Sequence, residues 1–309
     1  LALRARDLDI NLTLDAEESE RLDISLQIFK QVYQDPALGQ WDGFGIAVQA
    51  YQKRALAVIQ WLVTLAHQNH KRIPVRLVKG AYWDTEIKNA QVQGLESFPV
   101  FSRKVVTDIS YLACAELLIA NRDVLCARFA THNAYTAAAI ITLMQKSDSM
   151  DHVEFQNLQG MGSSLHDQIR ALNIPCRVYA PVGSHENLLP YLVRRLLENG
   201  ANSSFVNQIT DPNISIDDLV QNPLEVVDQF DSLVHPSIPQ PSAIFAERKN
   251  SSGFTLSHMA ALQQLQKEAE PYFSQTFYAA PFNDWQPDHG EQHTVLNPAA
   301  KNDIVGQVQ

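Results

Sequence analysis

The sequence predicts an α/β protein built as a (β/α)8 TIM-like barrel, of which about six βα units are visible. Short strand-like runs alternate with longer helical patterns along the first two thirds of the chain. Regular alternation of this kind indicates parallel strands joined by crossover helices. Polar residues also recur where the strand-like runs end, which is where a barrel of this type carries its active site.

Each predicted strand is followed by its own predicted helix. The strand-like runs fall at 9–14, 44–49, 73–79, 125–131, 152–157 and 175–180. The helical patterns fall at 16–34, 52–68, 103–121, 134–146, 163–172 and 185–199. In the first run, Ile10, Leu12 and Leu14 alternate with polar residues, which is typical of a half-buried strand. In the second helix, apolar residues recur at the three-to-four spacing of an amphipathic helix.

A doubly wound dinucleotide-binding sheet is the competing arrangement. It would carry GxGxxG after its first strand, and a nucleotide-triphosphate site would carry GxxxxGK[ST]; the sequence has neither, and "GMG" at 160–162 is the nearest match. The polar strand ends favour the barrel instead: they are Asp15, Gln49, Arg76 with Lys79, Thr131 with His132, and Tyr179. Because the chain opens on a strand-like run, we expect two N-terminal units of the barrel to be missing.

Composition narrows the class of protein. Of 309 residues, 45% are hydrophobic and 19% charged, as in a soluble globular protein, and the apolar runs are shorter than the ~20 residues that span a bilayer. A net charge of −10 argues against a general nucleic-acid binder, which would carry a basic face. The three scattered cysteines, Cys114, Cys126 and Cys176, suit a reducing cytoplasm. An anionic ligand would therefore be held by local cations.

Three segments are expected along the chain. Residues 1–205 form the partial barrel. Residues 206–280 read as a linker or cover segment, because X-Pro dipeptides are frequent there and a single helical pattern follows near 255–273. Residues 281–309 look like the opening hairpin of a further domain.

The stretch "RLVKGAYWDTEIK", 76–88, combines two cations with two large aromatic residues at a strand end. Arg76, Lys79, Tyr82 and Trp83 all lie within eight positions. A strand end needs only a turn residue, and Gly80 supplies it. The pattern therefore indicates a negatively charged, aromatic ligand. An alternative stays open, because Lys79 at a barrel strand end could form a Schiff base with a carbonyl substrate, as in an aldolase.

The stretch "YLVRRLLENG", 191–200, indicates a carboxylate clamp. On a helix, Tyr191, Arg194, Arg195 and Glu198 share one face, and each guanidinium offers a planar fork that suits a carboxylate. The opposite stripe, Leu188, Leu192 and Leu196, is expected to pack on the barrel. The alternative interpretation is a solvated helix face with an Arg–Glu pair.

Three hydrogen-bonding residues in "FATHNA", 129–134, come where a strand meets a helix N-terminus. Thr131, His132 and Asn133 could bind a pyrophosphate there, or Thr131 and Asn133 could simply cap the helix. The histidines show no metal-ligand spacing, so no metal site is predicted. Asp15 is either a helix-capping residue or an acid in the barrel mouth. Gln49 could form hydrogen bonds with the edge of a ligand ring.

Five motifs together resemble the proline dehydrogenase barrel of the bacterial bifunctional proline utilization A flavoenzymes. They are "RLVKGAYWDTEIK", "FATHNA", "EFQNLQGMG", "YAPVG" and "YLVRRLLENGANSSFVN". The resemblance runs from residue 1 to about 210. The tail resembles that family's linker and, at 281–309, the first strands of its aldehyde dehydrogenase domain.

The resemblance implies an FAD site and a proline site in the barrel mouth. Arg76 would lie near the flavin ring, Gln49 at its pyrimidine edge, and Trp83 against the adenine and not in the core. Asp15, Tyr82 and Tyr179 are implied as catalytic-site residues, with Asp15 able to bond Tyr179. The implied cofactor-binding residues are Ala16, Gln49, Arg76, Val78, Lys79, Gly80, Ala81, Trp83, Thr131, His132, Asn133 and Glu198. The implied substrate-binding residues are Leu158, Tyr191, Arg194 and Arg195.

The activity implied is FAD-dependent oxidation of L-proline to pyrroline-5-carboxylate, by hydride transfer to flavin N5. The family also carries an NAD-dependent pyrroline-5-carboxylate dehydrogenase domain, so that proline is converted to glutamate. A quinone electron acceptor, peripheral membrane association in the bacterial cytoplasm and a homo-oligomer are implied as well. No nucleic acid is expected to bind this segment.

One departure from the family pattern concerns the substrate site. The family uses a substrate-binding lysine on an early strand, and that strand precedes residue 1 here. A Schiff-base enzyme acting through Lys79, or an inactive fragment with a structural role alone, are the alternatives to the flavoenzyme.

Overall fold

The computed structural model describes residues 1–147, 151–200, 208, 211, 213–280 and 291–309, with the backbone alone for 196–200. These residues form two compact units, Leu1–Phe254 and Thr255–Gln309. The boundary between the units falls inside the segment 206–280 that was predicted as a linker.

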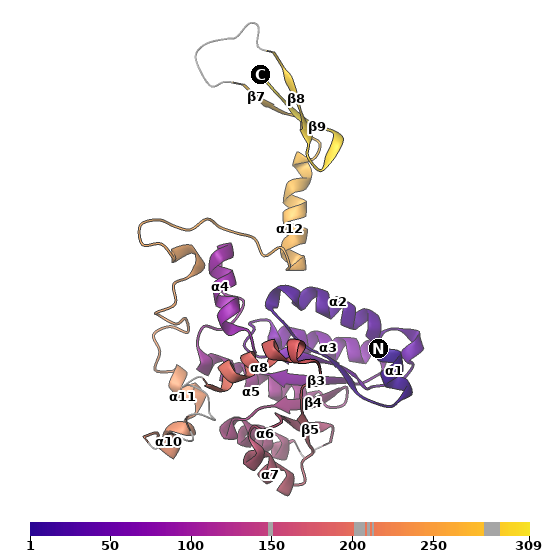
Figure 1. Ribbon diagram of the computed structural model, residues 1–309, viewed down its shortest axis with the longest axis vertical. Helices are drawn as coiled ribbons and strands as arrows, with labels where there is room; N and C mark the ends of the chain where they lie inside the picture. Colours follow the sequence, from indigo (N-terminus) through magenta and orange to yellow (C-terminus); the bar gives the residue numbers. More distant parts are fainter. Residues whose placement is uncertain (148–150, 201–207, 209–210, 212, 281–290) are drawn as a thin grey trace. The chain divides into compact units, whose positions relative to one another are not determined.

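A six-stranded parallel sheet forms the centre of the first unit (Figure 1). Its strands lie side by side in sequence order, and every neighbouring pair is parallel. A doubly wound sheet would reverse its strand order at a switch point, whereas this unbroken order is that of a barrel wall. The strands are β1 (Leu12–Leu14), β2 (Phe44–Gln49), β3 (Ile73–Val78), β4 (Leu125–Ala130), β5 (Val153–Leu158) and β6 (Cys176–Tyr179). The predicted partial barrel of six parallel strands is confirmed.

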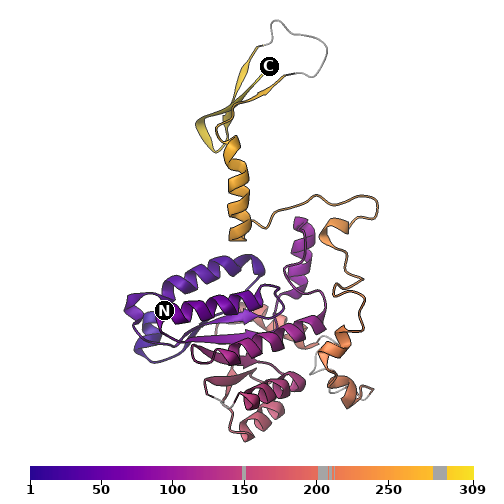
Figure 2. The ribbon, with the colours of Figure 1, turned by 180° about the vertical axis from the view of Figure 1, so that it is seen from behind.

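Helices follow the strands and cover one face of the sheet (Figure 2). Helix α5 packs between α3 and α6. The helices are α1 (Ala2–Asp7), α2 (Leu22–Tyr33), α3 (Ala55–Asn69), α4 (Trp83–Gln93), α5 (Lys104–Ala120), α6 (Ala134–Lys146), α7 (Ser163–Ala171), α8 (His185–Gly200), α10 (Ile216–Leu219) and α11 (Pro223–Val227), with 3-10 turns η1 (Ser19–Arg21), η2 (Pro36–Leu38) and η3 (Pro241–Ala243). Among the helices that the structure describes, none has both the length and the apolar character needed to cross a membrane.

Helix α1 shows that the expectation of a strand at the start of the chain is wrong. Residues Ala2–Asp7 are helical, and β1 begins only at Leu12. The stretch "LALRARD" consists largely of strong helix formers. Asp9, which has a φ of 50°, then turns the chain toward the strand.

Helix α4 was not predicted. Its sequence is largely polar and buries only Glu86, Ile87 and Ala90, so the helical periodicity of apolar residues is weak. Two local signals do mark it: Asp84 and Glu86 lie in the first turn, where they complement the helix dipole, and Gly94 ends the helix with a φ of 63°.

Alternating side chains of β3 separate the core from the pocket. Val75 and Leu77 are fully buried in the core cluster that the helices cover. Arg76 and Val78, between and after them, line a pocket on the other face. This period of two is the geometry of a strand, and it carries the polar side chains to the concave face of the sheet.

The two edges of the sheet expose apolar side chains. Val178 on β6 is 50% exposed, and Ile10, just before β1, is 56% exposed. In the part of the chain that the structure describes, neither β1 nor β6 pairs with a further strand. Exposed apolar groups at both edges agree with the prediction of a sheet that belongs to a larger barrel.

The leucine stripe of α8 does not pack as predicted. Leu192 is 44% exposed, Leu188 is half-buried, and the side chain of Leu196 lies outside the described residues. The physical reason is the orientation of the helix, because Tyr191 and Arg194 on the opposite face line the pocket. The stripe therefore faces away from the barrel mouth.

The second unit consists of a helix and a small sheet. It contains α12 (Met259–Ala269), η4 (Glu270–Tyr272), β7 (Phe277–Ala279), β8 (His293–Asn297) and β9 (Ala300–Val308). Strand β9 is central, antiparallel to β8 and parallel to β7. The predicted helix and C-terminal hairpin are confirmed, whereas β7 was not expected. Phe277, Val295 and Ile304 are each more than 40% exposed, so this unit has no apolar core of its own among the described residues.

Candidate active site

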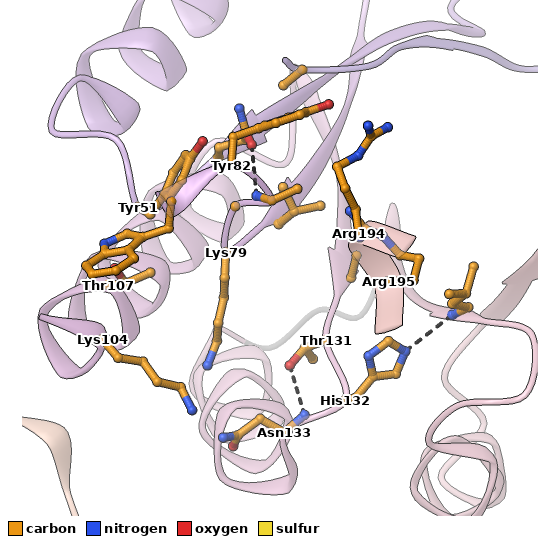
Figure 3. A pocket seen from close by; sticks show the side chains of 18 of the residues that line it. Tyr51, Lys79, Tyr82, Lys104, Thr107, Thr131, His132, Asn133, Arg194 and Arg195 are labelled. Atoms are coloured by element: carbon orange, nitrogen blue, oxygen red, sulfur yellow. Dashed lines mark hydrogen bonds between the residues drawn. The ribbon is translucent and has the colours of Figure 1, made fainter. Parts of the chain in front are cut away.

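The carboxyl ends of the barrel strands surround a cavity of about 680 Å³ (Figure 3). Every predicted site residue whose side chain the structure describes lines this one cavity. They are Asp15, Ala16, Gln49, Arg76, Val78, Lys79, Gly80, Ala81, Tyr82, Trp83, Thr131, His132, Asn133, Leu158, Tyr179, Tyr191, Arg194 and Arg195. The side chain of Glu198 lies outside the described residues.

Gly80 allows the loop after β3 to lie flat against an aromatic ring. It has a φ of 145°, and a Cβ at this position would lie 2.4 Å from Cγ of Tyr51. Any larger residue would therefore push the loop away from Tyr51. This close approach carries Lys79, Ala81 and Tyr82 to the wall of the cavity.

Gln49 joins the loop after β1 to the loop after β3. The side chain is 3% exposed. Its Nε2 donates to the Glu17 carbonyl at 2.6 Å, and its Oε1 accepts from the Ala81 amide at 3.3 Å. Gln49 therefore fixes two walls of the cavity, which is a role that the sequence did not suggest. Its contact with the edge of a ring stays a prediction.

Arg76 is held in place from three directions. Its Nε donates to Gln156 Oε1 at 2.9 Å, and its Nη1 lies 3.6 Å from Asp15 Oδ1. Its guanidinium carbon lies 5.5 Å from the centre of the Tyr179 ring. Arg76 therefore lies beside both Asp15 and Tyr179, the two residues that were expected to bond each other. It presents a fixed positive charge to the cavity.

Charged side chains on β5 and β6 are connected to Arg76 through Gln156. Gln156 Nε2 donates to Glu154 Oε1 at 2.6 Å, and Arg177 donates to both carboxylate oxygens of Glu154. Burial alone would raise the pKa of Glu154, but the hydrogen bonds from Arg177 and Gln156 outweigh it and lower the pKa. Arg128, which is only 8% exposed, adds a further positive charge near Glu154.

Lys79 forms an ion pair with Asp108 of α5. The contact with Asp108 occupies the amino group that a Schiff-base lysine would use to attack a carbonyl. The geometry thus favours Lys79 as a cation for an anionic ligand. Figure 3 shows its amino group directed toward the side of the cavity that also carries Lys104.

The "FATHNA" motif caps a helix and lines the cavity at the same time. Asn133 Oδ1 accepts from the Thr136 amide at 3.0 Å and so caps α6, and Thr131 Oγ1 accepts from the Asn133 amide at 3.2 Å. The capping interpretation is therefore confirmed for Asn133. His132 Nε2 accepts from the Leu158 amide at 3.3 Å, which requires a neutral imidazole with its proton on Nδ1.

Burial, with the nearby His166 and Arg195, lowers the pKa of His132 to about 4. The unfolded chain therefore takes up a proton on this histidine at a higher pH than the folded chain does. From the two pKa values, lowering the pH from 8 to 5 should cost about 2 kcal/mol of the free energy of unfolding at this residue. We expect His132→Asn to remove that part of the pH dependence in urea unfolding. His67→Asn, at an exposed position on α3, should keep the wild-type dependence of the free energy of unfolding on pH. The same dependence in His132→Asn would contradict the conclusion that folding lowers the pKa of His132.

Helix α8 places Arg194 and Arg195 at the wall of the cavity, on the side opposite Lys79 and Lys104 (Figure 3). The guanidinium carbon of Arg194 lies 5.4 Å from the centre of the Tyr82 ring, and that of Arg195 lies 5.4 Å from the centre of the Tyr191 ring. Both arginines are half-buried, which disfavours the interpretation of a solvated face. The Nε of Arg194 is buried and has no hydrogen-bond partner among the described residues, so it is a donor that a ligand anion could satisfy.

Trp83 packs into the protein as well as lining the cavity, so the expectation that it avoids the core is wrong. Its Nε1 donates to the Phe101 carbonyl at 2.8 Å, and its ring packs against the second core cluster, which contains Ile87 and Phe98. The physical reason is α4, which begins at Trp83 and brings the ring against its own buried face.

Trp83→Ala should therefore destabilise the ligand-free protein by about 2 kcal/mol, since it removes both half-buried packing and a hydrogen bond. A tryptophan that contacted only the ligand would change the stability of the ligand-free protein by less than about 1 kcal/mol. Trp83→Phe should restore most of the packing but not the hydrogen bond. Thermal unfolding of both variants without ligand measures the difference, and a loss below 0.5 kcal/mol in Trp83→Ala would show that the tryptophan acts only on a ligand.

Several lining residues were missed by sequence reasoning. Tyr51 lies two residues beyond Gln49 and carried no signal of its own. Arg103 and Lys104 stand at the start of α5, where a pair of cations could have been noticed. The remaining lining residues are Ser102, Val105, Thr107, Ala130, Met161, Phe230 and His235. Phe230 and His235 come from the segment interpreted as a linker, so no local pattern could have placed them here.

No group of three or more His, Cys, Asp or Glu side chains within the described ranges is arranged to hold a metal ion. The cavity instead combines cations with aromatic rings. Such a set suits a ligand that is both flat and negatively charged.

Comparison with known families agrees with this chemistry. The proline dehydrogenase family profile matches residues 1–208, which is more than half of the chain. The chain therefore belongs to the proline dehydrogenase family, a class of oxidoreductases.

Relatives that match almost the whole of this chain are named as bifunctional proteins. The bifunctional protein PutA of Salmonella typhimurium is 47% identical over 319 residues, covering 99% of this chain and 24% of that protein. PutA of Escherichia coli is 46% identical, covering 100% of this chain and 24% of that protein. A crystal structure of a proline utilization A variant from Bradyrhizobium japonicum superposes with a TM-score of 0.83 at 48% identity, covering 87% of this chain and 28% of that one. The chain thus spans about a quarter of the length of the curated relatives it matches.

Proposed function

We propose that this chain oxidises L-proline to pyrroline-5-carboxylate with FAD as the cofactor, as the first step of proline catabolism. The observation that carries the proposal is the cavity itself. It brings an arginine pair suited to a carboxylate and a separate group of cations and aromatic rings into one site, in a chain of the proline dehydrogenase family.

The residues present fit FAD. A cavity of about 680 Å³ lies within the range of sites for cofactor-sized ligands. Lys79 and Lys104 offer positive charge for a pyrophosphate, Trp83 offers a flat ring, and Arg76 presents a fixed cation to the cavity. FAD, when bound, supplies the hydride acceptor for the carbon next to the ring nitrogen of proline.

The chain's own residues bind and orient the substrate. Arg194 and Arg195 hold the carboxylate, and Leu158, Tyr179 and Tyr191 close around the ring. This fixes the reacting carbon and excludes water from it. Burial raises the pKa of the Tyr82 hydroxyl, so this phenol stays protonated and can donate a hydrogen bond within the site.

The test is reduction of bound flavin by proline in the full-length protein. The protein should purify with visible flavin absorbance, which L-proline bleaches in the absence of oxygen. The Schiff-base alternative makes a different prediction: borohydride would trap substrate covalently on Lys79 without any flavin. A chain that neither retains FAD nor responds to proline would support a structural role alone.

The larger protein is proposed to carry a second activity. By likeness to its bifunctional relatives, residues 281–309 open an aldehyde dehydrogenase domain that uses NAD to oxidise pyrroline-5-carboxylate toward glutamate, after a barrel at 1–205 and a linker at 206–280. We further propose a homo-oligomer in the bacterial cytoplasm that binds the membrane peripherally and passes electrons to quinone. Co-sedimentation with lipid vesicles, with and without proline, tests the membrane step.

A further inference from the structure

The chain beyond the barrel returns to the cavity. The segment 228–254, referred to below as the strap, belongs to the same compact unit as the sheet. It is tied to α4 at several points: Gln91 Nε2 donates to the Pro239 carbonyl at 2.9 Å, and the Gly253 amide donates to the Gly94 carbonyl at 2.9 Å. Because these bonds fix both its middle and its end, the strap is held against the barrel and not simply connected to it.

Two strap residues, Phe230 and His235, line the cavity. The guanidinium carbon of Arg103 lies 4.0 Å from the centre of the Phe230 ring, which is a close cation–π contact. The His235 amide donates to Ser102 Oγ at 2.9 Å, and Ser102 is 8% exposed. The strap thus meets the barrel immediately before the first turn of α5.

This contact lies at one end of the cavity. Lys104 follows Arg103 directly, and Figure 3 shows Lys79 and Lys104 on the side opposite Arg194 and Arg195. The strap therefore faces the group of cations and not the proposed carboxylate clamp. The Nε of Arg103 is buried and has no hydrogen-bond partner among the described residues, so it is a donor that an anionic ligand could satisfy.

We propose that the strap is a wall of the cofactor site, and that Phe230 with Arg103 binds the adenosine diphosphate end of FAD. The inference rests on the proposed function, and it assigns that end to a part of the chain outside the barrel. Phe230 supplies a flat apolar surface, and Arg103 supplies charge and a free donor beside it. A dinucleotide needs both at this end, a base to cover and phosphates to neutralise.

The strap also offers a matched control. Phe245 makes a similar pair, with the guanidinium carbon of Arg248 3.8 Å from its ring centre, but it is 43% exposed and does not line the cavity. Phe230→Ala and Phe245→Ala therefore remove the same side chain from the same segment. Phe230→Leu keeps apolar volume but removes the flat ring, in case the alanine variant folds poorly.

The experiment titrates the ligand-free full-length protein with FAD and, separately, with FMN, which lacks the adenylate. An aromatic contact of this kind should change the Kd for FAD roughly three- to tenfold. We expect that loss in Phe230→Ala, a smaller one in Phe230→Leu, and less than a twofold change in Phe245→Ala. The Kd for FMN should stay within twofold in all three variants.

Equal weakening of FAD and FMN, or an unchanged Kd for FAD in Phe230→Ala, would overturn the inference and leave the strap a packing element only. Those results would leave the proposed function intact as long as the wild-type protein binds FAD and is reduced by proline. A wild-type protein that binds no flavin would overturn both.

Discussion

Replacing Arg194 or Arg195 by methionine should raise the KM for proline far more than it lowers kcat. A carboxylate held alike in the ground and transition states contributes mainly to KM. Truncating one partner of a desolvated charge pair costs roughly 2–5 kcal/mol, which corresponds to about 30- to 5,000-fold in kcat/KM. Steady-state assays of the full-length variants with L-proline measure this change, with flavin absorbance recorded for each variant.

The control is Arg170→Met, which removes an arginine of similar helical context on α7. Arg170 pairs with Asp167 on the surface, and its side chain is 50% exposed. We expect that variant to stay within twofold of the wild type in kcat/KM and in flavin content. If both α8 variants remain within about threefold of wild type, the carboxylate clamp is wrong and the arginines serve packing against Tyr82 and Tyr191.

Replacing Glu154 by leucine should lower the free energy of unfolding by about 3 kcal/mol at neutral pH. The change removes the carboxylate whose negative charge acts on the nearly buried Arg128, and it removes the acceptor of Arg177 and Gln156. Removing the charge that faces a buried ion costs about 3–5 kcal/mol, which applies here to Arg128. The pair with Arg177 adds little, because the Arg177 side chain is 52% exposed, so the expected loss lies at the lower end. Urea unfolding of wild type and variant measures the difference.

The same prediction has a pH dependence with a definite sign. The pKa of Glu154 is lowered in the folded protein, so its ionised form stabilises the fold above the pKa that the residue has in the unfolded chain. This contribution is lost as the pH falls through the folded-state pKa, and the gap between wild type and Glu154→Leu should narrow in acid. Asp167→Leu, which breaks the exposed pair with Arg170, should change stability by less than about 1 kcal/mol at any pH. A gap that is small at neutral pH would show that the charged side chains around Glu154 do not stabilise the barrel.

The strand–helix alternation and the site residues could be read from the sequence because both are local signals. A strand such as Ile73–Val78 is encoded by its own apolar and β-branched residues, and polar groups at its carboxyl end must meet those of its parallel neighbours. The polar ends of the predicted strands, among them Gln49, Arg76 and Thr131, therefore predicted one site at the barrel mouth, and the structure brings these residues together in one cavity.

Helices with weak local signals could not be predicted in this way. Helix α4 forms from a polar stretch because the burial of Ile87 and Ala90 in a second core cluster decides its conformation. The ring of Trp83 packs against the same cluster, so it contributes to the core as well as lining the site. Propensity is only a weak prior where tertiary packing supplies most of the stability.

Contacts between distant segments were decided by the tertiary structure alone. Nothing near Gln49 indicates that its amide would join Glu17 to Ala81, and nothing near Phe230 indicates that its ring would lie against Arg103. These contacts depend on the positions of the loops and of the strap. Those positions are fixed in turn by hydrogen bonds between residues far apart in the chain, such as the one from Gln91 to the Pro239 carbonyl. The sequence by itself determined the barrel strands and the chemical character of their ends, because both depend on residues that are neighbours in the sequence. The shape of the cavity and the segment that closes it depend on long-range packing, which no local pattern encodes.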